Sequence, residues 1–293
     1  ATLKGGGLIF VILFCLYLFF SNLNFYGIYF ISAILFLSFI SFLDDLLDVN
    51  FKIRLVAHSF ITLLSFYGFL NYIEFSNYFF LFDSNIFNYL LTFIFIIWLI
   101  NVFNFMDGID GYAVLQSIYI LIFFIICIFN NSNSISLNLS VFLVLLSLLL
   151  SFLFFNFPKA KLFMGDVGSS TLGYILVILG FYLINSKVIT ISVYLCIFSV
   201  FLVDSSYTLI VRVLSKQNFF KAHKTHLYQK LNIYFESSFN SHLSVDVFFF
   251  LINAFIIMPY AFFLHIYDLN NFFFLIPIYL PLIFLCLAFK AGK

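Results

Sequence analysis

The sequence predicts an all-α integral membrane protein, with about ten transmembrane helices in a single domain over residues 1–293. Hydrophobic residues make up 65% of the chain, charged residues only 9%, and the mean hydropathy is +1.17. A soluble domain carries about 25% charged residues, so the composition excludes a soluble fold. Inside lipid every backbone polar group needs an internal partner, which favours helices.

Apolar runs of the length needed to cross about 30 Å of hydrocarbon recur along the whole chain. We expect spans at residues 7–21, 26–43, 55–73, 86–103, 112–129, 139–156, 169–185, 188–206, 245–265 and 271–289. The first run opens a continuous series of spans, so it does not resemble a cleavable signal peptide. All four cysteines fall inside apolar runs without metal-ligand spacing, and we assign them no chemistry.

The basic residues predict the orientation of the chain, because cytoplasmic loops of membrane proteins retain Lys and Arg. With the N-terminus inside, all of the 13 Lys and Arg residues except Lys187 fall in inner segments. The acids gather on the same side, and only Glu74, Asp83 and Asp268 are left outside. This distribution predicts a functional site at the cytoplasmic face. The charges are too few and too scattered to track a nucleic acid.

Residues 207–244 are the only long polar segment, and we expect them to form a long cytoplasmic loop. The start of this loop, YTLIVRVLSKQNFF, can form an amphipathic helix along the inner surface. Two interpretations remain open for the segment. One is a solvated loop, and the other is a lid over an anionic substrate.

The first motif is the pair Asp44 and Asp45, followed by Asp48 and then by Lys52 and Arg54. Adjacent carboxylates repel, and one pKa rises unless a cation or base is close, so the pair indicates a metal-binding or proton-transfer role. Plain interfacial charge is the alternative. The two basic residues either pair with the acids or hold the phosphate of a lipid.

The second motif is NVFNFMDGIDG, in which Asn101, Asn104, Asp107 and Asp110 are spaced by three. This spacing predicts that the four side chains lie along one helical face. The glycine after each aspartate lets another backbone or a ligand approach closely. Asn and Asp oxygens are the hard ligands that Mg²⁺ prefers, so the motif indicates a magnesium site.

The third motif is FMGDVGSS at residues 163–170, which leads directly into an apolar run. We expect Ser169 or Ser170 to cap the helix that follows. The free N–H groups of such a helix would bind an anion beside Asp166, and a diphosphate bridged by Mg²⁺ fits there. Any capped turn before a helix has a similar sequence, so the motif is weak by itself.

The fourth motif is HKTH, with His223, Lys224 and His226 in the long inner loop. Two histidines without a third ligand make a poor zinc site, so we interpret these residues as donors to phosphate and sugar oxygens. The remaining histidines are single and are interpreted as hydrogen-bonded structural residues: His58, His242 and His265.

Together the four motifs resemble the polyprenyl-phosphate N-acetylhexosamine-1-phosphate transferases, or glycosyltransferase family 4. This family includes the undecaprenyl-phosphate GlcNAc-1-phosphate transferases and the phospho-MurNAc-pentapeptide translocases. The resemblance covers nearly the whole chain: TLKGGG at residues 2–7 is similar to the end of the first inner loop, and DDLLD, NVFNFMDGIDG, NFPKAKLFMGDVGSS and AHKTHLYQKL follow in order. It implies a multi-pass protein of the bacterial inner membrane whose active site faces the cytoplasm.

The resemblance also implies a role for each matching position. The catalytic acids are Asp44, Asp45, Asp107 and Asp110. The first two match the pair that engages the lipid phosphate and supplies its base, and the last two match positions around the nucleotide. Asn104 and Asp166 match ligands of Mg²⁺, for which Mn²⁺ can substitute. The implied substrate-binding residues are Lys52 for the lipid phosphate, Asn156 for the nucleotide, Phe163 for stacking on uracil, Ser169, and the loop residues His223, Lys224 and His226 for the diphosphate and sugar.

The implied reaction moves an N-acetylhexosamine 1-phosphate from a UDP-sugar to undecaprenyl phosphate, which gives undecaprenyl-diphosphate-sugar and UMP. The expected partners are this UDP-N-acetylhexosamine, undecaprenyl phosphate and membrane lipid, without nucleic acid; a homodimer is left open. Because the family's chain normally begins with one more helix before the GGG, we expect a first helix to be missing upstream of residue 1. Its HxxHxYQ loop is sparser in histidine than usual, which is similar to the branch that uses 6-deoxy sugars at the first step of O-antigen and lipopolysaccharide synthesis.

Two other classes of membrane protein are weighed against the enzyme. Ion-coupled transporters also carry carboxylates and asparagines in their helices, but they place them near the midplane and often show inverted repeats. No internal repeat is evident here, and the acids are expected at the inner ends. A purely structural scaffold leaves the alignment of acids unexplained. The longer acidic pattern of the CDP-alcohol phosphotransferases is not present.

Overall fold

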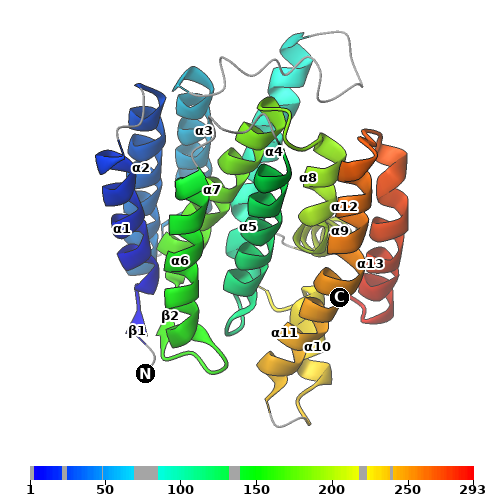
Figure 1. Cartoon of the computed structure of the whole chain (residues 1–293). Helices are drawn as coiled ribbons and strands as arrows, with labels where there is room; N and C mark the ends of the chain where they lie inside the picture. The colour runs from blue at the N-terminus through cyan, green and yellow to red at the C-terminus, as the bar shows by residue number, and fades with distance from the viewer. Residues whose placement is uncertain are drawn as a thin grey trace.

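The computed structural model describes residues 3–21, 25–47, 49–68, 85–131, 139–217, 223–237 and 240–293. The chain forms a bundle of helices whose long members run roughly side by side (Figure 1). Its first half contains β1 (Leu3–Lys4), α1 (Gly6–Phe20), α2 (Phe25–Leu47), α3 (Phe51–Gly68), α4 (Asn85–Met106), α5 (Tyr112–Asn130) and α6 (Leu139–Asn156). Its second half contains β2 (Leu162–Phe163), α7 (Gly165–Asn185), α8 (Ile191–Ile197), α9 (Ser199–Leu214), α10 (Leu227–Tyr234), α11 (Ser241–Ile252), the π-helix η4 (Asn253–Ile257), α12 (Met258–Ile266), the 3-10 helix η5 (Phe272–Leu275) and α13 (Ile276–Ala288). The expected all-α membrane fold is therefore confirmed.

Six helical segments among the described residues are long and apolar enough to cross a membrane. A seventh candidate is the pair α8 and α9, which bends by 74° at Phe198. The helices α1 and η5–α13 are apolar but shorter, and α3 carries Lys52 and Arg54 in its first turn. The count of ten spans is therefore not confirmed, and residues 69–73 of the third expected span lie outside the described part of the chain.

The expected span at 188–206 is broken by a bend in the structure. Residues 191–197 form α8, and a new helix starts at Ser199 in a different direction. The expected amphipathic segment that begins at Tyr207 forms the last two turns of α9, so the chain remains helical to Leu214. The long polar segment therefore contributes to α9, to α10 and to the start of α11.

The centre of the bundle is α7, which packs against α1, α2, α4 and α5. This helix is almost completely enclosed by protein, with 94% of its most apolar window buried. Gly7 of α1 lies directly against Gly168 of α7, and no Cβ fits at either position. Small residues let membrane helices approach closely, so this pair fixes the N-terminal segment against the start of α7.

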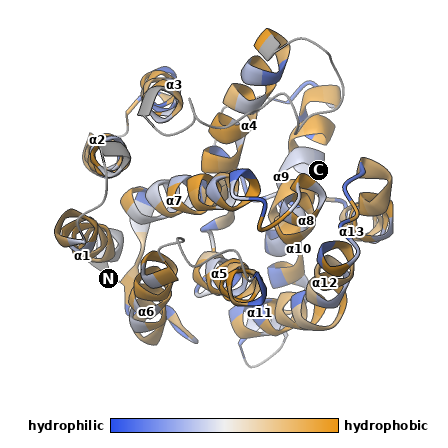
Figure 2. Ribbon diagram, turned by 45° about the horizontal axis from the view of Figure 1, so that its top comes forward, coloured by the Kyte–Doolittle hydropathy of each residue, from blue (hydrophilic) through white to orange (hydrophobic). Residues whose placement is uncertain are grey.

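The outer helices present large apolar side chains to their surroundings, and they are coloured as hydrophobic along most of their length (Figure 2). Phe19 is 71% exposed and Phe154 is 79% exposed. The four cysteines are buried and free, as expected for residues without chemistry. An apolar outer surface of this kind belongs in lipid, because in water it would drive aggregation.

The expected motifs gather at one end of the bundle, the lower end in Figure 1, where β1, β2 and α10 lie. The two short strands pair in parallel, with Leu3 opposite Leu162 and Lys4 opposite Phe163. The N–H of Gly7 donates to the carbonyl of Met164 at 3.0 Å. The TLKGGG segment is thereby joined to the FMGDVGSS segment.

Candidate active site

Four carboxylates from three separate motifs lie within electrostatic reach of one another at this end of the bundle. They are Asp44 and Asp45 at the end of α2, Asp107 after α4, and Asp166 in the first turn of α7. We call these four residues the acidic cluster. Asp48, the third acid of the DDLLD motif, lies outside the described residues.

Arg54 is the cation that contacts this cluster. Its Nη1 lies 2.8 Å from Oδ2 of Asp44 and 3.7 Å from Oδ2 of Asp166. Asp44 is buried, whereas the side chains of Arg54 and Asp166 are 37% and 38% exposed. The two basic residues after the DDLLD motif therefore differ in role: Arg54 pairs with the acids, and Lys52 is exposed on the outside of α3.

Asp45 lies against the N-terminus of α7. Gly165 has a φ of +71°, and a Cβ at this position would lie 2.9 Å from Oδ2 of Asp45. The N–H of Val167 is 3.4 Å from the same oxygen. A glycine is required here because the backbone is in the left-handed region and a carboxylate closely approaches it.

The start of α7 differs from the expectation in a way that changes its capping. The helix begins at Gly165, four residues before Ser169, so neither Ser169 nor Ser170 caps it. The hydroxyl of Ser169 instead donates to the carbonyl of Gly165 at 3.2 Å, inside the helix. The expected serine cap is wrong because Gly165 lets the chain enter the helix earlier.

Asn104 joins the second motif to the third. Its Nδ2 lies 3.2 Å from the hydroxyl of Ser169 and 3.4 Å from that of Ser170, and its side chain also interacts with Asp166. The structure thus brings together Asn104 and Asp166, the two residues expected to bind Mg²⁺. One turn earlier, Asn101 Nδ2 lies 3.2 Å from Nδ1 of His58, so His58 is hydrogen-bonded as expected.

The expectation that four residues of the second motif share one helical face is wrong. The helix α4 ends at Met106, so Asp107 and Asp110 lie in the turn that follows. Burial raises the pKa of Asp107 well above its ordinary value, and the charges of Asp166, Asp45 and Asp110 raise it further. Asp107 therefore remains with the acidic cluster.

Asp110 turns toward a different part of the chain. Its Oδ2 accepts the N–H of Ala160 at 3.0 Å and lies 3.2 Å from Nδ1 of His242. Asn156 is buried, and it accepts the N–H of Gly111 at 2.9 Å while donating to the carbonyl of Leu162 at 2.9 Å. These contacts tie the 107–111 turn to the 157–163 loop, and Phe163 stands exposed at the edge of that loop.

The start of α10 is held by Asp204, a buried residue that the sequence analysis did not select. Its carboxylate accepts the N–H groups of Leu227 at 2.8 Å and Tyr228 at 3.2 Å, and its Oδ1 lies 3.2 Å from Nδ1 of His226. A carboxylate at the N-terminus of a helix satisfies N–H groups that have no partner within the helix. Asp204 thereby fixes the position of His226.

The α10 segment also contacts the turn after α4. Tyr228 donates its hydroxyl to the carbonyl of Phe105 at 3.0 Å, and the ring of His226 stacks on that of Phe105 with centroids 6.2 Å apart. The rings of His223 and His226 stack at 4.9 Å, and Lys224 is exposed. Burial lowers the pKa of His223 to about 4, so its imidazole is neutral near pH 7.

The donor set fits a hard divalent cation that is shared with a ligand. Among the described residues, no three His, Cys, Asp or Glu side chains converge tightly enough to hold a metal ion by themselves. Mg²⁺ in phosphate-binding sites typically uses one or two carboxylates and completes its shell with water and substrate phosphates. An excess of carboxylates beside Arg54, Asn104 and the N-terminus of α7 suits such a site.

The comparison with a family model covers the first three of the four motifs. A family model described as glycosyl transferase family 4 matches residues 27–184. A probable undecaprenyl-phosphate N-acetylglucosaminyl 1-phosphate transferase of Bacillus subtilis (strain 168) is 36% identical over 146 residues, covering 49% of this chain and 40% of the relative.

Two phospho-N-acetylmuramoyl-pentapeptide-transferases are also similar. That of Dictyoglomus turgidum is 34% identical over 176 residues, covering 57% of this chain and 55% of its own. That of Clostridium beijerinckii is 33% identical over 184 residues, covering 53% and 56%. The chain spans about half the length of the curated relatives that it matches. The family match covers more than half of this chain and contains the acidic cluster, so the chain belongs to glycosyl transferase family 4.

Proposed function

We propose that this protein transfers an N-acetylhexosamine 1-phosphate from a UDP-sugar to undecaprenyl phosphate at the cytoplasmic face of a bacterial membrane. The observation that carries the proposal is the contact of Arg54 with Asp44 and Asp166, with Asp45 lying against the N-terminus of α7 beside Asp166. The names of the relatives support it, because both kinds describe the transfer of a phosphorylated amino sugar.

The acceptor in this proposal is a phosphate on a lipid, and the two basic residues of α3 lie where it would arrive. Arg54 is only partly engaged, at 3.7 Å from Asp166, and Lys52 is exposed one half-turn away. A phosphate that approaches from the membrane surface would meet the exposed Lys52, and Arg54 lies next to the acids further in. Asp45, beside them, is the base that accepts the proton of the acceptor phosphate.

A pocket on the other side of α4 suits the polyprenyl chain. It has a volume of about 490 Å³ and is lined by apolar side chains that include Trp98, Tyr207 and Tyr279. Trp98 lies six residues before Asn104 on α4, about 9 Å along the helix axis.

The donor diphosphate is assigned to the N-terminus of α7 and to the start of α10. Asn104 and Asp166 are the proposed Mg²⁺ ligands, and the bound ion would supply charge stabilisation for the diphosphate and the leaving UMP. His226 is held by Asp204 and donates to a phosphate or sugar oxygen, and Lys224 adds positive charge beside it. Attack of the lipid phosphate oxygen on the sugar-bound phosphorus breaks the bond to UMP.

The proposed sugar is an N-acetylhexosamine, with 6-deoxy members included because the loop before α10 contains only two histidines. The experiment offers purified protein a panel of UDP-N-acetylhexosamines with undecaprenyl phosphate and MgCl₂. We expect stoichiometric UMP and a lipid-diphosphate-sugar with one member of the panel, and neither product in EDTA. Uptake of a solute into proteoliposomes without any UMP would contradict the proposal and favour a transporter.

A further inference from the structure

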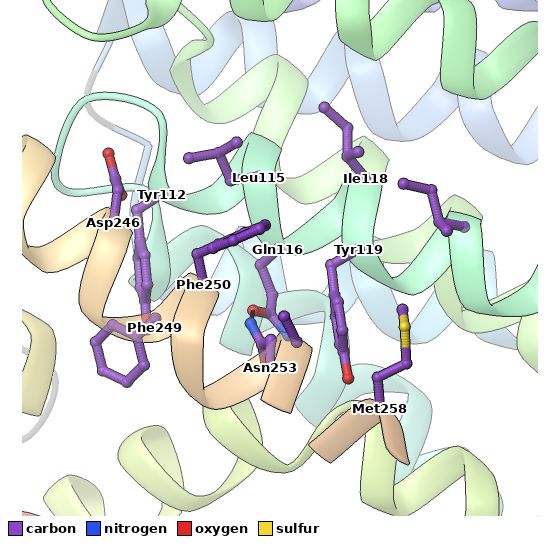
Figure 3. A pocket seen from close by; sticks show the side chains of 12 residues that line it. Tyr112, Leu115, Gln116, Ile118, Tyr119, Asp246, Phe249, Phe250, Asn253 and Met258 are labelled. Carbon is purple, nitrogen blue, oxygen red and sulfur yellow. Dashed lines mark hydrogen bonds between the residues drawn. The ribbon is translucent and has the colours of Figure 1, made fainter. Parts of the chain in front are cut away.

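A second pocket lies between α5 and the continuous helix α11–η4–α12, and the proposed reaction does not use it. It has a volume of about 210 Å³ (Figure 3). Most of its wall is apolar and aromatic, and Tyr112, Tyr119, Phe249 and Phe250 contribute four rings. This pocket is distinct from the acidic cluster, whose residues do not line it.

Several residues that line this pocket have buried polar atoms without a hydrogen-bond partner among the described residues. These atoms are both carboxylate oxygens of Asp246, Nε2 of Gln116, Oδ1 of Asn253 and the hydroxyl oxygens of Tyr112 and Tyr119. Gln116 and Asn253 do contact each other, with Asn253 Nδ2 donating to Gln116 Oε1 at 2.6 Å, but the other half of each amide is unused. Native proteins leave few buried polar groups unsatisfied, so a concentration of them in one pocket indicates a bound molecule.

Asp246 is the charged residue of this pocket, so it determines which charge a bound molecule would need. Its side chain is 4% exposed, and no ion pair of Asp246 is found among the described residues. The nearest histidine along α11, His242, is paired with Asp110 instead at 3.2 Å. A buried carboxylate is stabilised by a cation or by a proton, and a positively charged hydrogen-bond donor in the pocket would supply both the charge and the donors that Asp246 lacks.

The polar atoms follow an order along the pocket. Asp246 and Tyr112 lie at one end, the Gln116–Asn253 pair lies in the middle, and Tyr119 with Met258 lies at the other end (Figure 3). The Asp246 end is nearer the face of the membrane that carries the acidic cluster, because Ser241 begins α11 there. The π-helix η4 starts at Asn253, and such irregular turns are frequent at functional sites.

This order matches a membrane lipid that enters from the side. Phe250 is 62% exposed and Ile122 is 39% exposed, so the pocket borders the lipid-facing surface. A lipid places its headgroup cation nearest the membrane face, its phosphate and ester oxygens deeper, and its acyl chains deepest. Along the pocket a carboxylate is followed by the amide donor of Gln116 and the hydroxyl donor of Tyr119.

We propose that this pocket binds a membrane lipid with a primary ammonium headgroup, with the ammonium at Asp246 and the phosphate or ester oxygens at Gln116 and Tyr119. A primary ammonium offers three N–H donors, whereas a quaternary ammonium offers none, and the oxygens of Asp246 lack donors. The surrounding rings of Tyr112 and Phe249 add attraction for a cation. The proposal does not depend on the proposed function.

Native mass spectrometry of the detergent-purified, delipidated protein tests this inference. The protein is mixed with equal amounts of dioleoyl-phosphatidylethanolamine and dioleoyl-phosphatidylcholine, and the bound lipids are counted. We expect the ethanolamine lipid to be retained in about tenfold excess, which corresponds to about 1.4 kcal/mol. Equal retention of the two lipids by the unmodified chain would overturn the proposal.

Three variants locate the site. Asp246→Asn should bring the two lipids to equal retention. Asp268→Asn, which removes an exposed carboxylate near the end of α12, should keep the preference. Tyr119→Phe removes a single hydroxyl that would contact oxygens common to both lipids, so it should reduce the retention of each lipid about two- to fivefold, even if the Asp246 variant folds poorly. An unchanged preference in Asp246→Asn, together with unchanged retention of both lipids in Tyr119→Phe, would place the lipid elsewhere and refute the assignment.

A free amine is the competing source of the ammonium group. The same binding measurement is repeated with methylammonium chloride in place of the two lipids. We expect weak retention of methylammonium, since the acyl chains and phosphate contribute the remaining contacts. Retention of methylammonium at Asp246 without any preference for the ethanolamine lipid would contradict the lipid assignment.

Discussion

The Nη1 atom of Arg54 lies 2.8 Å from Oδ2 of Asp44 and so joins the first turn of α3 to the last turn of α2. The same nitrogen lies 3.7 Å from Asp166 at the start of α7. One guanidinium thus links three helices at the point where their acids meet. This arrangement makes Arg54 both a structural residue and the nearest cation to an incoming phosphate.

Replacing Arg54 tests this double role. Arg54→Gln leaves the buried carboxylate of Asp44 without its partner, and we expect a loss of about 1–3 kcal/mol in the free energy of unfolding. We also expect UMP release to fall at least about tenfold, measured at saturating donor. Lys52→Gln, two residues away and exposed, is the matched control and should keep the stability of the unmodified chain. Equal stability of the two variants would show that the ion pair contributes nothing.

The raised pKa of Asp107 predicts that this residue lowers the stability of the folded protein even though the proposed reaction needs it. Its pKa is raised in the folded protein from the ordinary value of 3.8, so the folded state binds this proton more tightly than the unfolded state. The contribution to stability is therefore present at low pH and is lost as the pH rises through the raised pKa. At any pH above the ordinary pKa of an aspartate, the environment of Asp107 therefore opposes folding.

It follows that Asp107→Asn should raise the Tm of the metal-free protein near neutral pH while lowering UMP release. The gain in Tm should shrink as the pH is lowered toward 4, because the carboxyl of the unfolded chain is then protonated as well. Thermal unfolding in EDTA across this range measures the effect. A Tm below that of the unmodified chain at neutral pH would contradict the assigned environment of Asp107.

Divalent cations should stabilise the protein through the acidic cluster. A ligand that binds only the folded state adds RT ln(1 + [L]/Kd), about 2.7 kcal/mol at 100 times Kd. We expect MgCl₂ with a UDP-sugar to raise Tm, and Asp166→Asn to abolish the increase. The increase in Tm with MgCl₂ is compared with that in CaCl₂, which should be smaller because the larger Ca²⁺ ion requires more ligands. An equal rise in the Asp166 variant would exclude this residue as a ligand.

Asp204 should act on the reaction through the position of α10. Its carboxylate accepts the N–H groups of Leu227 and Tyr228, so Asp204→Ala should speed hydrogen exchange at these two amides. Because His226 also loses its partner, KM for the UDP-sugar should rise about tenfold or more, with a smaller change in kcat. Lys224→Gln is the control for exchange, as its exposed side chain leaves α10 in place. Unchanged exchange at Leu227 would remove Asp204 from this role.

The fold class and the grouping of the motifs were predictable because both depend on patterns within the sequence. Apolar runs indicate membrane helices, and the distribution of Lys and Arg places the acids on one side. The meeting of Asp45, Asn104 and Asp166 was expected from a family resemblance. Periodicity alone gave no reason for α2, α4 and α7 to be neighbours.

Details of the helix ends were not predictable from spacing. Asp107 and Asp110 continue the three-residue spacing of Asn101 and Asn104, yet the helix stops at Met106 and the two acids point to different partners. Gly165 starts α7 before the serines because a left-handed residue redirects the chain. Such terminal geometry depends on tertiary contacts that one segment does not contain.

The bend at Phe198 and the role of Asp204 were missed for a related reason. The segment from Ile191 to Leu214 is apolar enough to read as one helix, and no proline or glycine marks the 74° change in direction. A single aspartate within the run VFLVDSSY was the available signal, because a carboxylate in an apolar helix needs partners. Those partners come from a segment more than twenty residues away.

The most direct test of the central claim is UMP release from Asp45→Asn, Asp166→Asn and the double variant, each compared with Asp268→Asn. Residues that act as one unit lose about the same activity singly and together. We predict that each single variant falls about 100-fold or more and that the double variant falls little further. Near-normal release from either single variant, or losses that multiply in the double variant, would contradict a shared site at the start of α7.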